Sequence, residues 1–422
     1  MADGLVLLLM VASFAVLAVG LKLPMGLALA LAAAVGAVAG GQGLAVRHLV
    51  EGAFGFFDII LIIATAMVFI RVLQDNGLLD SLVAAILRTF FRRKVLLLLT
   101  VMLLLMFPGM ITGSSLAAVL STGPLIAPVL VRLGLSPARA GAFVAMGAIL
   151  GMIAPPVNIL VMIMGAGVDM PYVGLTGPLF LVTVPAAIII ALGLGFRHLR
   201  VPSPEELAAL LPPRERPRGG ILLYAPVLVV LILMVLQNLD VPFFPTLGLP
   251  AIFILGSLAG LLGGRRFNVF RTTQKAVAEA GPILSILVGV GMFIQVMTLT
   301  GGRGWLVMLF LSVPSALLYA GLATGMPLFG GVSAFGSASV LGVPFLLAFV
   351  GKNAVITASA LSAVVGLGDL MPPAAMAARF SAQVVGEPNF FKVIRHCLLP
   401  ALLVLAAGLG MLLGSTFLDT FL

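Results

Sequence analysis

The chain has 422 residues, of which 62% are hydrophobic and only 9% charged, and its mean hydropathy is +1.27. These values exclude a soluble domain and predict an integral membrane protein embedded in a lipid bilayer. The net charge of +9 could suggest a nucleic-acid partner, but we expect none, because the basic residues sort to one side of the predicted spans. The single Cys397 excludes an internal disulfide and a cysteine zinc cluster.

Long apolar runs predict helices, since a β-barrel would show short segments of alternating hydropathy. We interpret residues 1–196 as a first structural repeat. It is predicted to contain, in chain order, spans over 5–20 and 26–40, an amphipathic piece over 47–52, a span over 54–73, an interfacial helix over 78–91, a re-entrant hairpin over 107–130, a broken helix near 151–158 and a last span over 175–196.

The hairpin at 107–130 is the most informative segment of this half. Prolines and glycines resist regular helix there, and Thr112, Ser114 and Ser115 add hydroxyls. Broken backbone at membrane depth persists only where it is buried in protein or lines a polar cavity. The segment therefore predicts a helix–turn–helix whose tip, from Thr112 and Gly113 to Ser115, faces a binding site. The double proline Pro155-Pro156 predicts a second break, with freed carbonyls beside Asn158.

A proline-rich polar stretch over 197–220 predicts a cytoplasmic linker, and residues 221–422 repeat the order of the first half. This second repeat is predicted to have an amphipathic surface segment over 265–275, a span over 282–299, a hairpin over 327–350 and a broken helix near 368–375. Its hairpin carries Ser333, Gly336, Ser337 and Ser339, and its break is the double proline Pro372-Pro373.

The basic residues predict the orientation of the spans. With both termini outside and the repeats inverted, eighteen of the 23 Lys and Arg fall on one face, which is then cytoplasmic. The chain is thus predicted to be a multi-pass protein of a bacterial cytoplasmic (inner) membrane. Inverted repeats with paired hairpins and broken helices are typical of secondary transporters that bind their cargo near the midplane.

The candidate site residues divide by chemistry. Hydroxyl, amide, carboxylate and backbone oxygens suit sodium, which predicts a sodium role for Thr112, Gly113, Ser114, Asn158, Ser333, Gly336, Ser339 and Asp369. We expect the first tip and the first break to share one sodium site, and the second tip and Asp369 to form another. Substrate contacts are predicted for Ser114, Ser115, Ser337 and Arg379. Asp369 and Arg379 alternatively form a structural ion pair, the serines could serve only helix packing, and Arg71 is predicted to snorkel to the interface.

The run GSSLAAVLSTGPLIAPVLVRLGLSPARAGAFVAMGAILGMIAPP and the later GDLMPP and VVGEPNFFKVIRHCLLP resemble the large membrane subunit of tripartite ATP-independent periplasmic (TRAP) transporters, the DctM-like family. The resemblance implies sodium-driven uptake of a small organic acid, such as a dicarboxylate, by an elevator motion. It also implies a small four-helix membrane subunit and a periplasmic substrate-binding protein as partners. The chain departs from that family at Val157-Asn158 and at Ala375–Arg379, where ions and substrate would bind.

Other functions remain open at this point. The chain could be a stand-alone ion-coupled transporter of organic anions with the same fold, or a membrane component that binds without transporting. A channel is less consistent, since no continuous polar face repeats along the spans. An enzyme is not expected, because His48, His198 and His396 all lie at predicted surfaces and neither HExxH nor a P-loop occurs. No cofactor is expected besides Na⁺ as the coupling ion.

Overall fold

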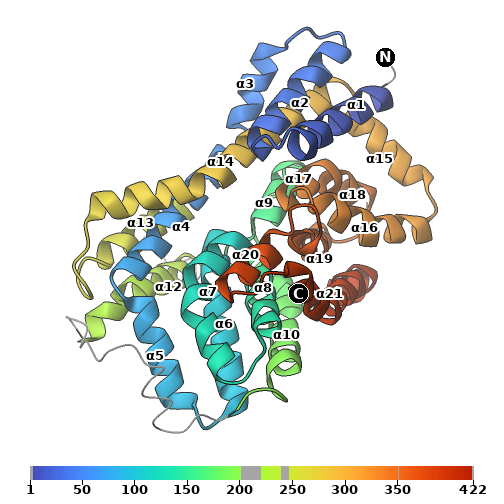
Figure 1. Cartoon of the computed structure of the whole chain (residues 1–422). Helices are drawn as coiled ribbons and strands as arrows, with labels where there is room; N and C mark the ends of the chain where they lie inside the picture. Colours follow the sequence, from blue (N-terminus) through green and yellow to red (C-terminus); the bar gives the residue numbers. More distant parts are fainter. Residues whose placement is uncertain (1–2, 201–219, 239–246, 350, 421–422) are drawn as a thin grey trace.

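The protein is an all-α polytopic membrane protein. The computed structural model describes residues 3–200, 220–238, 247–349 and 351–420, so the predicted linker at 197–220 lies almost entirely outside the described residues (Figure 1). All regular elements in these ranges are helices, and eight of the described helices are long and apolar enough to cross a membrane.

The first half of the chain follows the predicted order closely. Its elements are α1 (Asp3–Ala15), η1 (Val16–Gly20), α2 (Met25–Ala39), α3 (Val46–Phe54), α4 (Phe57–Asp75), α5 (Leu78–Phe90), α6 (Lys94–Thr112), α7 (Ser115–Arg132), α8 (Pro137–Ile153), α9 (Ile159–Ala166) and α10 (Thr176–Gly195). The double proline separates α8 from α9, and α6 and α7 pack side by side as the two arms of the first hairpin.

The second half contains η2 (Gly220–Tyr224), α12 (Ala225–Asn238), α13 (Leu249–Ala259), α14 (Val269–Leu299), α15 (Gly302–Ser312), α16 (Ser315–Gly330), α17 (Ala334–Ser337), η3 (Ala338–Gly342), α18 (Val343–Ala348), α19 (Ala354–Gly366), η4 (Leu367–Leu370), α20 (Met376–Val384), α21 (Phe390–Leu413) and α22 (Ser415–Leu418). Here α16 is the first arm of a hairpin, and α17, η3 and α18 form the second. The order of short helix, hairpin, broken helix and long helix matches that from α5 to α10.

Three predicted boundaries are wrong. The hairpins expected to begin at 107 and 327 begin earlier, at Lys94 of α6 and Ser315 of α16, because these helices continue through Pro108 and Pro327.

The third boundary lies in α14. From Val269 onward, the segments expected at 265–275 and 282–299 belong to a single helix of 31 residues, α14, which includes Pro282. A proline removes only one helical hydrogen bond, so a long helix packed on both sides can absorb it. That packing comes from α2, α3 and α4, which lie along α14 in Figure 1.

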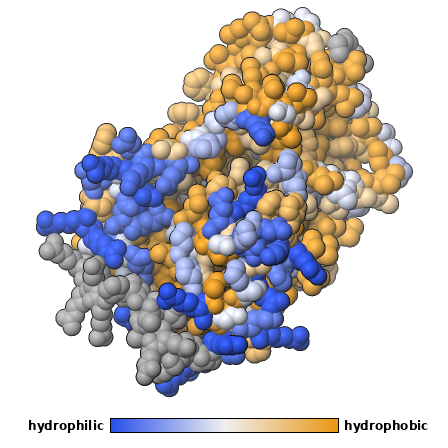
Figure 2. All heavy atoms as spheres, in the orientation of Figure 1, coloured by the Kyte–Doolittle hydropathy of each residue, from blue (hydrophilic) through white to orange (hydrophobic). Residues whose placement is uncertain are grey.

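The helices gather in two groups. The first consists of α1 to α4 with α12, α13 and α14. The second surrounds α8, which is buried from Ala140 to Ile153, and contains α6, α7, α10, α20 and α21, with α9 and α16 to α19 beside it. Figure 2 shows hydrophilic residues at the left, over α13 and the start of α14, and along the lower edge, and a mainly hydrophobic surface over α1, α2 and α15 at the top. The candidate site lies where the two groups meet.

Candidate functional site

The two hairpin tips are built alike. In the first, the left-handed Gly113, with φ +61°, ends α6, and the Ser114 hydroxyl accepts a hydrogen bond of 3.2 Å from the amide of Ala117 at the start of α7. In the second, the Ser333 hydroxyl accepts a bond of 3.1 Å from the amide of Gly336. Among the predicted tip serines, Ser114 and Ser333 are therefore the N-caps of the returning arms.

Each tip is also attached to the break of its own half. The amide of Val157, just after the first double proline, donates to the carbonyl of Met110 at 3.1 Å. The amide of Ala374, just after the second, donates to the carbonyl of Gly331 at 2.9 Å. The prolines Pro155, Pro156, Pro372 and Pro373 interrupt the helices as predicted, and the amides that follow them fasten the breaks to the hairpins.

Glycines permit this close approach. Gly151 and Gly368 each lie four residues before the first proline of their break, and they pack on Gly109 and Gly330 of the hairpin arms. A Cβ added at Gly109 would come within 2.9 Å of the Gly151 carbonyl carbon, and one at Gly330 within 2.9 Å of the Gly368 Cα. At both contacts the two backbones touch directly, so a side chain on either glycine would not fit.

A cavity of about 60 Å³ lies between the two tips and the second break. This is several times the space that one water needs. Its polar lining consists of Ser114, Ser115, Ser333 and Asp369, and the Ser115 hydroxyl donates a hydrogen bond to Oδ2 of Asp369. The first tip thus reaches the carboxylate of the second half, across 254 positions of sequence.

Regular helices close the other side of this cavity. Met25 of α2 and Pro282, Ile283 and Ile286 of α14 complete the lining. Sequence pattern does not single out Met25, Ile283 or Ile286, because they belong to ordinary apolar spans. The isolated Pro282 is the signal that could have indicated this part of the site.

Asn158 lies apart from the cavity lining and is fully buried. Its side-chain oxygen caps α9 by accepting from the Val161 amide at 3.1 Å, and its Nδ2 donates to the Ile153 carbonyl at 2.9 Å and to the Ser362 hydroxyl at 3.0 Å. The structure therefore brings Ser114, Ser115, Ser333 and Asp369 together, but does not place Asn158 with Ser114 around one cavity. The sodium role of Asn158 stays a prediction.

The remaining predicted hydroxyls bond to backbone carbonyls. The Thr112 hydroxyl donates to the Pro108 carbonyl at 2.7 Å, and the Ser339 hydroxyl donates to the Gly336 carbonyl at 2.8 Å. Each of these bonds lies within one hairpin arm. The amide of Gly336 donates to the capping hydroxyl of Ser333. Ser337 donates to the Met326 carbonyl at 2.8 Å and so ties α17 to α16. In this conformation these hydroxyls stabilise the hairpins.

Arg379 lies on the exposed face of α20, with its guanidinium 5.6 Å from the ring centroid of Phe390. Within the described ranges, neither the salt bridges nor the hydrogen bonds join it to Asp369. The structure thus gives no support to the alternative of a structural ion pair, and a contact between Arg379 and an acidic substrate stays a prediction.

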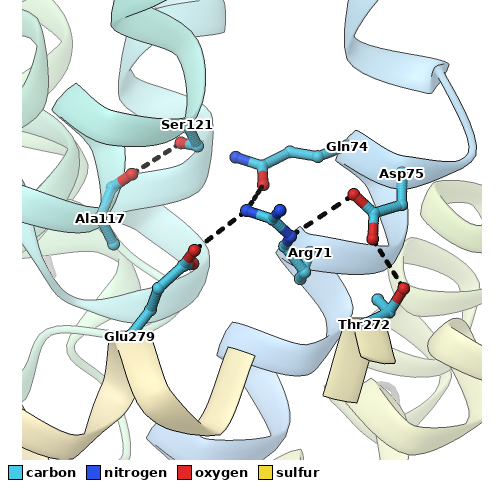
Figure 3. A network of polar contacts seen from close by, with 7 residues as sticks. All are labelled: Arg71, Gln74, Asp75, Ala117, Ser121, Thr272 and Glu279. Atoms are coloured by element: carbon cyan, nitrogen blue, oxygen red, sulfur yellow. Dashed lines mark hydrogen bonds and ion pairs between the residues drawn. The ribbon is translucent and has the colours of Figure 1, made fainter. Parts of the chain in front are cut away.

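Arg71 does not snorkel to the interface. Its side chain, only 22% exposed, bridges α4 and α14 by pairing with Glu279 at 3.0 Å and with Asp75 of its own helix at 3.4 Å, and Asp75 accepts a bond from Thr272 (Figure 3). Figure 3 also shows Ser121 of α7 next to this cluster. The network therefore fastens α14, which closes one side of the cavity, to α4.

Comparison with known proteins indicates the class of protein, a membrane transporter. Residues 4–196 match the sequence profile of the Na⁺/H⁺ antiporter family, a family of membrane transporters and not of enzymes. The YdaH transporter of Alcanivorax borkumensis has a similar fold, with a TM-score of 0.60, 18% identity and 87% of each chain covered. MtrF of Neisseria gonorrhoeae, from a structure titled for a class of antimetabolite efflux pumps, gives a TM-score of 0.55 at 14% identity, covering 87% of this chain and 82% of that one. No curated protein matches the chain in sequence.

The resemblance to TRAP transporters is therefore wrong as an assignment of family. The matching profile is that of the Na⁺/H⁺ antiporter family, and the similar solved structures are YdaH and MtrF. The misleading features were the hairpins and double-proline breaks, because broken helices of this kind occur in more than one transporter fold. The residues after the breaks, Val157-Asn158 and Ala375–Arg379, already differed from the TRAP pattern. The four-helix subunit and the periplasmic binding protein were implied only by that resemblance and lose their support.

Proposed function

We propose that the protein is a stand-alone secondary transporter driven by a cation gradient, in which Na⁺ or H⁺ binds at Asp369 in the cavity between the two hairpin tips. The observation that carries the proposal is the bond from Ser115 of the first tip to the Asp369 carboxylate. A carboxylate at membrane depth is costly, and it is retained mainly where it meets an ion or a proton.

The lining of the cavity favours a cation. It offers the Asp369 carboxylate and the hydroxyls of Ser114, Ser115 and Ser333, and none of its lining residues is Lys, Arg or His. Hard cations prefer such oxygen ligands. A single carboxylate that accepts either Na⁺ or H⁺ also provides the simplest basis for exchanging one for the other, which agrees with the family that the first half matches.

The packing of the chain supports alternating access. The hairpins, breaks and α8 are held together by bonds and glycine contacts, while α14 and its neighbours form the other group. A cavity at the boundary of two such groups opens to either side when one group moves against the other, as in an elevator. The two halves act in this proposal as inverted repeats, each supplying one hairpin and one break.

An organic anion is a second candidate cargo. The N-terminal end of the 18-residue α7 lies at the cavity, where Ser115 and Leu116 line it, and the positive end of a helix suits a carboxylate. The description of the N. gonorrhoeae relative as an efflux pump for antimetabolites also favours an organic cargo beside the ion. Export and uptake are both compatible with this site.

The test is ion transport by the purified full chain in proteoliposomes. With an imposed Na⁺ or pH gradient and an internal pH dye, we expect wild type to move the coupled ion and Asp369→Asn to be at least about tenfold slower, since the neutral amide cannot exchange a proton or balance Na⁺. Asp58→Asn, which removes an exposed carboxylate from α4, is the matched control and should keep wild-type rates. Wild-type transport by a folded Asp369→Asn variant would overturn the proposal.

A further inference from the structure

A groove of about 370 Å³ lies away from the ion cavity, between the start of α8, the end of α10 and the first half of α21. Most of its wall is apolar. The apolar lining residues are Ile189, Ile190, Gly193, Leu194, Leu399, Pro400 and Leu403. Leu399 is 78% exposed, so the groove opens to the outer surface of this helix group. It joins helices from both halves of the chain.

Three side chains with N–H donors line the same groove, and two of them are arginines that carry a full positive charge. The three are Arg139 of α8 and Arg395 and His396 of α21. No Asp or Glu lines the groove, and no ion pair neutralises Arg139 or Arg395 among the described residues. The groove thus combines an unbalanced positive charge with an apolar wall.

The basic groove lies at the end of the molecule that the sequence predicts to be cytoplasmic. The Arg200 amide donates to the Leu133 carbonyl at 2.7 Å, which joins the end of α10 to the turn between α7 and α8. Arg132, Arg139, Arg197, Arg200 and Arg395 therefore belong to the face that the sequence predicts to be cytoplasmic. Basic pockets between helices on that side suit the head groups of anionic lipids.

We propose that this groove binds one anionic phospholipid, with the phosphate between Arg139, Arg395 and His396 and an acyl chain along Ile189, Ile190 and Leu403. The occupant is a lipid and not free phosphate, because a phosphate ion would leave the apolar wall uncovered. It is anionic because a zwitterionic head group would not balance the charges. Bound there, the lipid holds α8 and α10 of the first half against α21 of the second.

Gly193 allows the two parts of the site to be tested separately. Gly193 lines the groove, and a Cβ at this position would meet nothing within 4 Å, so Gly193→Phe is designed to occupy the apolar part of the groove with its ring. Arg139→Gln/Arg395→Gln removes the charges and leaves the apolar wall. Arg92→Gln/Arg93→Gln removes the same charge from the exposed cluster between α5 and α6 and is the matched control.

The experiment is native mass spectrometry of the full chain in detergent with added phosphatidylglycerol or phosphatidylcholine. We expect wild type and the control to retain one phosphatidylglycerol, and both groove variants to bind it at least about fivefold more weakly, with little phosphatidylcholine retained by any of them. If Arg139→Gln/Arg395→Gln weakens binding but Gly193→Phe does not, the site takes the head group alone and the lipid proposal fails. Equal retention of both lipids, or unchanged binding in both groove variants, also overturns it.

Discussion

Asn158 shows how one buried polar side chain can hold a broken helix together. At the first break its amide oxygen caps α9, while its amide nitrogen bonds to the end of α8 and to Ser362 of α19. All these groups are buried, so each lost bond leaves an unsatisfied polar atom. The residue therefore links both parts of the first broken helix to the broken helix of the second half.

We expect Asn158→Ala to destabilise the protein by about 2–4 kcal/mol, because a helix cap and two buried hydrogen bonds disappear together. Asn268→Ala is the matched control. It removes a cap at the exposed start of α14, where Asn268 accepts from the Arg271 amide at 3.0 Å, and should cost only about 1 kcal/mol. Thermal unfolding in detergent measures both. Equal losses for the two variants would argue against a special role of Asn158 in joining the breaks.

At the scale of elements, the same packing device occurs in both halves. A glycine four residues before the double proline lies against a glycine of the hairpin arm, Gly151 on Gly109 and Gly368 on Gly330. Because these contacts are between backbones, each hairpin and its broken helix form one rigid unit. In the proposed mechanism this unit moves as a whole.

Gly151→Ala and Gly368→Ala should each push hairpin and broken helix apart, with a loss of about 1–3 kcal/mol of stability typical of overpacking and slower transport. Gly281→Ala provides the control within α14, since a Cβ there meets nothing within 4 Å, and it should be neutral or slightly stabilising. Thermal unfolding and transport in proteoliposomes measure the two effects. If Gly151→Ala and Gly368→Ala affect stability and transport as little as Gly281→Ala does, the close backbone contacts at Gly151 and Gly368 are contradicted.

At the scale of the whole molecule, the distribution of charge predicts the orientation in the membrane. The basic cluster of Arg88, Arg92, Arg93 and Lys94 lies at the turn between α5 and α6, and Arg47 lies in α3. Figure 1 places α5 and α3 at opposite ends of the molecule. The positive-inside rule then predicts the turn at Arg92 to be cytoplasmic and α3 to be outside.

Cysteine labelling in intact cells tests this orientation. In a Cys397→Ser background, a membrane-impermeant maleimide should label a cysteine at Arg47, on exposed α3, but label one at Arg92 only after the cells are opened. The native Cys397 is buried, so its removal serves to clear the background. Labelling of the Arg92 position from outside would reverse the orientation, and equal labelling of both positions would contradict the placement of α3 and of the turn between α5 and α6 on opposite sides of the membrane.

The amino-acid sequence by itself determined the class of protein and the positions of its irregular backbone. Hydropathy alone indicated a polytopic helical membrane protein, and Gly113, Ser114, Ser333 and the two double prolines marked the tips and breaks within a few residues of where they lie. Such features depend on local backbone preferences, since proline lacks an amide donor and glycine accepts a left-handed conformation. A single sequence contains this information directly.

Only the tertiary structure decided which side chains meet. Ser115 bonds to Asp369, Arg71 pairs with Glu279 on α14, and Arg379 lies on an exposed face instead of beside Asp369. Packing also decided that α14 continues through Pro282. These outcomes depend on how helices far apart in sequence pack against each other, which no local pattern encodes. The family was misjudged for a different reason. Tips and breaks are local features common to many transporter folds, whereas the profile match covers residues 4–196 as a whole.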